Sequence, residues 1–269
     1  VSFNTVAKLL ADAGAACADL HDEWVMDVPS ERVQCDEIWA FCYAKDKNVP
    51  TAKAAPEGAG SVWTWTALDP DTKLMVSYAV GDRSTELARI FMLDLADRLR
   101  GRVQLTTDGF GAYLKAVTDA FQGDVDYARL IKLFGEPQGV TSPERRYSPG
   151  VCTGIIKEPV FGNPDEAKIS TSHVERQNLN MRMGMRRFTR LTNGFSKKVE
   201  SHAAMVAVYT VFYNFCRQHR SLKKLTPAMA AGLTDHIWDM EEVVAWIDNL
   251  APAPKKRGPY KKREPKISN

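Results

Sequence analysis

Runs of apolar residues in the first third of the chain predict three strands. The apolar and aromatic run 38–43 is typical of a buried strand, and the runs 62–68 and 74–80 are also strand-like. The segment 69–73 between the last two carries proline and aspartate, which favour a turn. The pattern therefore predicts a strand followed by a β-hairpin.

Helical and strand-like patterns then alternate. Apolar residues at helical spacing predict a helix over 85–100, closed by Gly101, and a short strand follows over 103–107. A second helix is expected over 113–121 and a strand over 127–134. Three antiparallel strands followed by alternating helix and strand describe an α/β fold, a mixed sheet covered by helices.

The second half of the chain combines a long irregular stretch with helices. Residues 135–172 contain five prolines and are too long for a plain connector in a compact domain, so we expect either a functional loop or a mobile one. Helical patterns follow over 173–188, 196–219 and 227–250. The two tryptophans of the last region are expected to pack back on the body.

The two ends of the chain differ in sequence pattern, with a helical pattern at the N-terminus and a basic, proline-containing segment at the C-terminus. Ser2 is placed to cap an N-terminal helix, which resembles the second helix of a helix-turn-helix and equally fits an ordinary amphipathic helix. Because the first residue is Val1 and not Met, we expect an N-terminally truncated chain. Beyond Pro252 the sequence is rich in Pro, Gly, Lys and Arg, which cannot build a core, and it is expected to be disordered when unbound.

The composition is that of an ordinary globular protein. The 269 residues are 44% hydrophobic and 26% charged, enough to bury the core of one large or two small domains. No apolar run long enough for a membrane span and no signal peptide pattern is present, so we expect no membrane association and a cytoplasmic, nucleoid-associated protein. The five cysteines are scattered and never spaced C-x-x-C, which favours reduced thiols over disulfides or a zinc site.

The net charge of +3 is unevenly distributed. Residues 173–198 carry seven Lys or Arg against Glu175, and residues 251–269 carry seven against Glu264. Two basic segments on an acidic body indicate a polyanionic partner, because neutralising phosphates supplies most nucleic-acid affinity. The alternative is that these charge runs are merely solvated.

Three acidic residues stand out by position. Asp36 opens the first apolar strand, Asp108 ends the central strand, and Glu175 lies near the start of a helix. Carboxylates on separate elements near strand ends can share a hard cation, so we expect the three to converge on a metal site and to raise at least one carboxyl pKa by repulsion. Adjacent strand residues point to opposite faces, so Glu37 is expected to face elsewhere; a Glu37 aimed at Asp108 would contradict the triad.

The helix after Glu175 aligns further polar residues. Glu175, Asn178, Arg182 and Arg186 share one face at helical spacing, beside an apolar stripe. A metal ligand leading into a row of phosphate contacts is one interpretation, and a solvated face is the other. His173 could orient a carboxylate or contact DNA, or be simply structural.

Several motifs resemble the transposases of the insertion sequence one type, a DDE family. They are Cys35-Asp36-Glu37-Ile38-Trp39, Thr107-Asp108-Gly109-Phe110, Ser172-His173-Val174-Glu175-Arg176-Gln177-Asn178 and the stretch 186–198. Tyr213-Asn214 with Arg217, His219, Leu222, Thr226 and Pro227 is similar to the end of integrase-like catalytic domains. The resemblance runs from about Val1 to Asp235.

This resemblance implies a ribonuclease H-like fold with Asp36, Asp108 and Glu175 as catalytic metal ligands. It also implies two Mg²⁺ or Mn²⁺ ions, double-stranded DNA as substrate at transposon ends and target, and a homo-oligomer on DNA. Family members usually begin with a zinc-binding and helix-turn-helix region, of which this chain has at most the last helix. The expected domains are a helix-turn-helix remnant and linker over 1–30, the catalytic domain over 31–222, a helical extension over 223–250 and the basic tail over 251–269.

The expected DNA contacts come from both basic segments. They are Arg176, Asn178, Arg182, Arg186, Arg187, Arg190, Lys197, Lys198, Lys255, Lys256, Arg257, Lys261, Lys262 and Arg263. Two other functions remain open at this point: a metal-dependent nuclease of the same fold, which would hydrolyse without joining, and a DNA-binding remnant that has lost catalysis.

Overall fold

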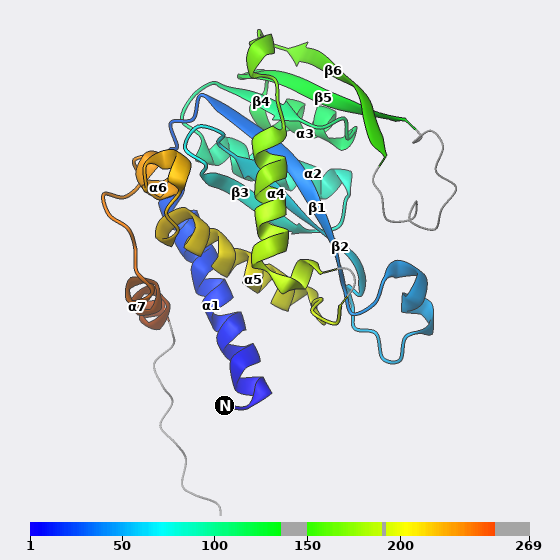
Figure 1. Cartoon of the computed structure of the whole chain (residues 1–269), viewed down its shortest axis with the longest axis vertical. Helices are drawn as coiled ribbons and strands as arrows, with labels where there is room; N and C mark the ends of the chain where they lie inside the picture. Colours follow the sequence, from blue (N-terminus) through cyan, green and yellow to red (C-terminus); the bar gives the residue numbers. More distant parts are fainter. Residues whose placement is uncertain (136–149, 190–191, 251–269) are drawn as a thin grey trace, which may run out of the picture.

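The computed structural model describes residues 1–135, 150–189 and 192–250. These residues form one six-stranded sheet with helices on both faces (Figure 1). The strands are β1 (Arg32–Cys42), β2 (Gly60–Leu68), β3 (Met75–Gly81), β4 (Val103–Thr107), β5 (Val125–Gly135) and β6 (Val151–Phe161). The α-helices are α1 (Phe3–Trp24), α2 (Thr85–Arg98), α3 (Ala112–Phe121), α4 (Ser172–Gly184), α5 (Val199–Val211), α6 (Pro227–Ala230) and α7 (Met240–Leu250).

The sheet order is β3-β2-β1-β4-β5-β6. The first three strands are antiparallel neighbours, β4 and β5 run parallel to β1, and β6 returns antiparallel to β5. This order and its crossover helices give a ribonuclease H-like α/β fold, as the sequence predicts.

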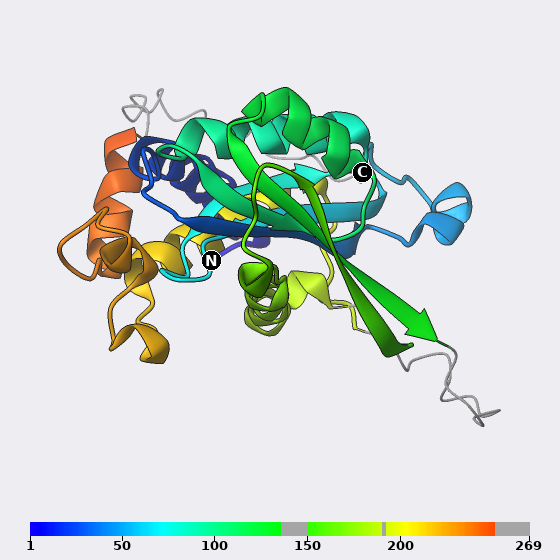
Figure 2. The ribbon, with the colours of Figure 1, turned by 90° about the horizontal axis from the view of Figure 1, so that it is seen from above.

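Two layers of helices enclose the sheet. Helices α2 and α3 cover one face and α4 covers the other, while α1 and α5 pack together beside β3 (Figures 1 and 2). The core between α2, α3 and the sheet contains Trp65, Phe91 and Tyr113, all fully buried. A second core below α4 contains Val174 and Met181. Helix α4 is therefore fixed to the sheet by its apolar side.

The strand predictions are confirmed for the hairpin and for the central strands, with two corrections. The first strand begins at Arg32, so Asp36 lies inside β1 and does not open it. The stretch after Gly135 was expected to be a loop, but 151–161 forms the edge strand β6. An edge strand tolerates Pro159 because its outer amide needs no partner.

The helices are confirmed in type but differ in length, and the region predicted as helical over 227–250 is two helices, α6 and α7, separated by residues 231–239. Helix α1 is capped by the Ser2 side chain. Helix α4 ends at Gly184, short of residue 188, and α5 ends at Val211 before a π-helical turn. Glycine is a poor helix former, which accounts for the early end of α4. Trp238 is buried, and Trp246 packs on the same core. No helix in the described ranges has the length and apolar content of a membrane span.

Candidate active site

Asp36 and Asp108 lie next to each other because their strands are parallel neighbours. Gln34 of β1 pairs with Thr106 of β4, so two residues further along Asp36 lies beside Asp108, just after the end of β4. Asp108 Oδ1 accepts a hydrogen bond from Phe110 N at 2.9 Å. This local turn fixes the orientation of the Asp108 carboxylate.

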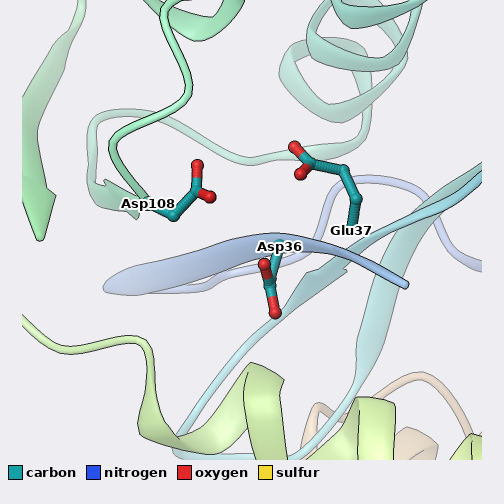
Figure 3. A group of neighbouring side chains, drawn as sticks. All are labelled: Asp36, Glu37 and Asp108. Carbon is teal, nitrogen blue, oxygen red and sulfur yellow. The ribbon is translucent and has the colours of Figure 1, made fainter. Parts of the chain in front are cut away.

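Glu37 belongs to the same group, so the expectation that it faces elsewhere is wrong. By the criterion stated above, this arrangement contradicts the predicted triad, and the third ligand must be chosen again between Glu37 and Glu175. Its side chain leaves β1 on the face opposite to Asp36, as strand alternation requires, but it is directed toward Asp108 (Figure 3). One carboxylate oxygen from each of Asp36, Glu37 and Asp108 lies within 4.8 Å of the others. Asp108 can meet both neighbours because it lies in the loop beyond its strand.

Two side chains hold α4 against β1 and so place Glu175. Gln34 Oε1 accepts hydrogen bonds from the backbone amides of residues 173 and 174 at 3.0 and 3.2 Å. Asn178 Nδ2 donates to Asp36 Oδ2 at 2.8 Å, one turn after Glu175. The helix is therefore bound to the strand on both sides of Glu175.

Glu175 shares a cavity of about 330 Å³ with Asp36 and Asp108. Lys132 also lines the cavity, and its Nζ donates to both carboxylate oxygens of Glu175 at 2.5 Å. We call Asp36, Glu37, Asp108 and Glu175 the acidic cluster. Three of its members line one cavity, and the fourth approaches from the opposite face of the sheet.

Arg83 is the second cation of the site. Its Nη2 donates to Glu37 Oε2 at 3.1 Å and lies 3.8 Å from Asp108 Oδ2. The guanidinium lies over the Phe110 ring at 3.9 Å and over Trp63 at 4.9 Å. Because aromatic faces attract cations, these two rings hold Arg83 at the carboxylates.

Burial and mutual repulsion raise carboxyl pKa values in the cluster. Burial is the largest cause that raises the pKa of Asp36 to about 7, and the negative charges of Glu37 and Asp108 add to it. Burial likewise raises the pKa of Glu37. The expectation that at least one carboxyl pKa is raised is confirmed, although burial contributes more than like charge.

The donor set fits a hard divalent cation. Mg²⁺ and Mn²⁺ prefer oxygen ligands, and the cluster offers carboxylates from three separate elements. Glu37 Oε1 is buried and makes no hydrogen bond of standard geometry among the described residues, although the Tyr113 hydroxyl lies close enough to offset part of the rise that burial causes in the pKa of Glu37. A buried carboxylate oxygen without such a bond is unfavourable, and a nearby cation would compensate it.

The residues predicted to contact DNA differ in their exposure to solvent. Arg176, Arg182, Arg186, Lys197 and Lys198 are exposed, while Arg187 is half-buried and donates to Ser196 Oγ at 3.2 Å. Arg190 and the residues of the tail lie outside the described part of the chain.

Two corrections concern the expected row of residues on the helix. Asn178 is only 6% exposed and its amide contacts Asp36 and Thr66, so it lies in the interior and not on a DNA-facing surface. Arg186 lies beyond the end of α4, in a 3-10 turn over Arg186–Phe188, so the row does not continue to it. His173 is half-buried, and its Nδ1 is 3.1 Å from Lys73 Nζ.

Sequence reasoning missed both cations of the site. Arg83 precedes α2 and Lys132 lies inside β5, and no spacing along the chain links either to an acid. Glu37 was visible as the neighbour of Asp36, and strand alternation alone led to its exclusion.

Comparisons with known proteins give only distant likenesses. No family model and no curated protein matches the chain. A chain of the simian T-cell lymphotropic virus intasome in complex with PP2A regulatory subunit B56 gamma is 12% identical, with TM-score 0.40, over 88% of this chain and 61% of its own. A chain of the piggyBac transposase synaptic complex with hairpin DNA is 11% identical, with TM-score 0.31, over 84% and 55%.

A third likeness is to a chain of the Mos1 strand transfer complex, 14% identical with TM-score 0.26, over 76% of this chain and 61% of its own. This chain thus spans between 55% and 61% of the lengths of the three structures. Similarities this weak support no conclusion about fold or function, and we assign the fold class from the sheet order alone.

Proposed function

We propose that this protein is a DNA transposase that cleaves transposon ends and joins the freed 3′-hydroxyl to target DNA. The observation that carries the proposal is the meeting of Asp36, Glu37 and Asp108 within 4.8 Å on a ribonuclease H-like sheet. Glu175 of α4 lines the same cavity as Asp36 and Asp108. The resemblance of the surrounding motifs to insertion sequence one transposases supports the same function.

Asp36, Asp108 and Glu175 are the proposed metal ligands. Glu175 is favoured over Glu37 because its side chain is 38% exposed, whereas that of Glu37 is 1% exposed. Each carboxylate is bound to one cation, so the ion pairs do not decide between them. Ions that act on DNA must be reachable from the cavity. Two divalent ions bound there would supply electrostatic stabilisation of an in-line displacement at phosphorus.

The remaining residues prepare the site. The hydrogen bond from Asn178 holds the Asp36 carboxylate in place. Lys132 is ion-paired with Glu175, and a bound divalent cation would replace Lys132 there. With its pKa near 7, Asp36 holds a proton for part of the time at neutral pH, and a divalent charge would release that proton. The exposed Arg182 and Arg186 are proposed to contact DNA phosphates.

The test is a joining assay on DNA that carries the ends flanking this gene, with a target plasmid and Mg²⁺ or Mn²⁺. We expect cleaved and joined products with the unmodified protein, and neither with Asp36→Asn, Asp108→Asn or Glu175→Gln. Exposed Glu166→Gln is the matched control and should retain activity. Cleavage without joining would indicate a nuclease, and DNA binding without cleavage would indicate an inactive remnant.

Glu37→Gln tests the choice of ligands. We expect Glu37→Gln to retain joining activity. Any reduction should come from the loss of its ion pair with Arg83. If Glu37→Gln abolishes both steps while Glu175→Gln retains them, Glu37 is the third ligand and the assignment of Glu175 is wrong.

A further inference from the structure

A second cavity, of about 250 Å³, lies on another side of α4 and is lined by basic side chains. We call it the basic pocket; its basic lining residues are Lys73, His173, Arg176, Arg217 and His219. No acidic side chain lines it in the ranges that the structure describes. Pockets for drug-sized molecules usually measure about 300–1,000 Å³, so this one suits a smaller group.

Helix α4 contributes to both cavities. His173, Arg176 and Asn180 are three and four residues apart in turn, so they share one face and line the basic pocket. Glu175 lies on another face and lines the acidic cavity. A ligand in the basic pocket would therefore be held one helix away from the acidic cluster.

One buried polar atom of the basic pocket lacks a partner in the described part of the chain, and Lys73 is held by Pro70 O and by His173. Lys73 Nζ donates to His173 Nδ1 at 3.1 Å, which assigns the proton of the neutral His173 ring to Nε2. His219 Nε2 is buried and has no hydrogen-bond partner among the described residues. An anion with several oxygens would satisfy donors of this kind.

The charges of the basic pocket are only partly offset, because Asp71 and Asp69 lie near Lys73 but outside the pocket lining. Burial, followed by the charges of Arg217 and Lys73, lowers the pKa of His219 to about 4. The nearby acids are already engaged, because Asp71 pairs with Arg32 at 2.5 Å and Asp69 accepts a hydrogen bond from Ser30 at 2.8 Å. Arg83 and Lys132 bind the carboxylates of the acidic cluster directly, whereas no ion pair within the described residues joins an acid to Arg176 or Arg217 of the basic pocket.

We infer that the basic pocket binds a phosphate group. Resting on the proposed function, the phosphate is assigned to the backbone of DNA, held beside α4 while the acidic cluster acts on a neighbouring bond. Free phosphate or a small phosphorylated compound offers the same chemistry, and the two sources are separated by experiment.

The first arm measures binding of inorganic phosphate by calorimetry at pH 7, without DNA or metal. We expect Arg217→Gln and Arg176→Gln to weaken phosphate binding about tenfold, the usual effect of losing a charged hydrogen bond. Exposed Arg220→Gln, three residues from Arg217 and outside the pocket lining, is the matched control and should change binding less than about twofold. Thermal unfolding verifies that each variant is folded.

The second arm replaces single DNA phosphates by uncharged methylphosphonates. We expect one or two positions at which replacement weakens binding of the unmodified protein about tenfold but hardly affects Arg217→Gln. Phosphate affinity unchanged in both pocket variants overturns the inference. Loss of phosphate affinity without any coupled DNA position overturns the assignment to DNA and leaves a free anion as ligand. The first arm uses neither DNA nor metal, so it stands even if joining activity is never observed.

Discussion

Replacing Asp36 by asparagine should stabilise the metal-free protein while removing its activity. The pKa of Asp36 is raised from 3.8 to about 7, chiefly by burial. One pKa unit corresponds to 1.36 kcal/mol, so the ionised carboxylate destabilises the folded state by roughly 4 kcal/mol above pH 7. Asparagine has the same shape and no charge, and its oxygen can still accept the hydrogen bond from Asn178.

The effect has a defined pH dependence. Below pH 4 Asp36 is protonated in both folded and unfolded protein, so the variant should have nearly the same stability as the unmodified chain. As pH rises, the unfolded chain loses the proton first, and the stability contributed by the protonated folded form is lost as pH approaches the folded pKa near 7. The advantage of Asp36→Asn should therefore grow from about 1 kcal/mol at pH 4.5 to roughly 4 kcal/mol at pH 8.

Urea unfolding in EDTA at pH 4.5, 6 and 8 measures this difference. Exposed Asp97→Asn is the control, and we expect it to shift stability by no more than about 0.5 kcal/mol at any of these pH values. Asp36→Asn that is equal to or less stable than the unmodified protein at pH 8 would refute the account of a buried, repelled carboxylate.

Three further predictions address the support of the site, the packing of α1 and the tail. Asn178→Leu removes the donor to Asp36 Oδ2, so metal affinity measured by titration should fall about 10–100-fold, and an unchanged affinity would contradict a positioning role. Gly14→Ala should destabilise the protein by about 1–3 kcal/mol in thermal unfolding, because the added Cβ would clash with Ala204 Cβ, whereas Gly111→Ala meets nothing within 4 Å and should be tolerated. Deleting residues 251–269 should lower the log–log salt slope of DNA binding by about 0.9 for each phosphate that the tail neutralises, and an unchanged slope would show that it neutralises none.

The sequence predicts the sheet where one face or both faces are buried. The runs that form β2, β3 and β4 are apolar because they lie in the core, and their turns carry proline or glycine, so pattern and structure agree. Strand β6 lies at the sheet edge, and its Val151 and Ile155 are 56% exposed. Without burial there is no alternation to detect, and the prolines of the stretch 135–172 favoured a loop.

The sequence predicts only those features of the candidate site that depend on local secondary structure. Asp108 after a strand and Glu175 near a helix start were found by position, whereas Asp36 was selected as the start of a strand that in fact begins at Arg32. The helical face shared by Glu175 and Asn178 was correct, but the sequence could not tell that this face turns toward β1. The bend of Glu37 toward Asp108 depends on the loop after β4, which only the folded chain defines.

Counting bound Mn²⁺ by electron paramagnetic resonance tests most directly whether the acidic cluster is a metal centre. The measurement uses the protein bound to a duplex with the transposon ends, and it needs no turnover. We predict two Mn²⁺ ions per active site in the unmodified protein, in keeping with a two-metal mechanism. Asp108→Asn should lose at least one ion, whereas the control Asp97→Asn should retain both. No specific Mn²⁺ binding, or binding equal in Asp36→Asn, Asp108→Asn and Glu175→Gln, would contradict the proposed metal centre.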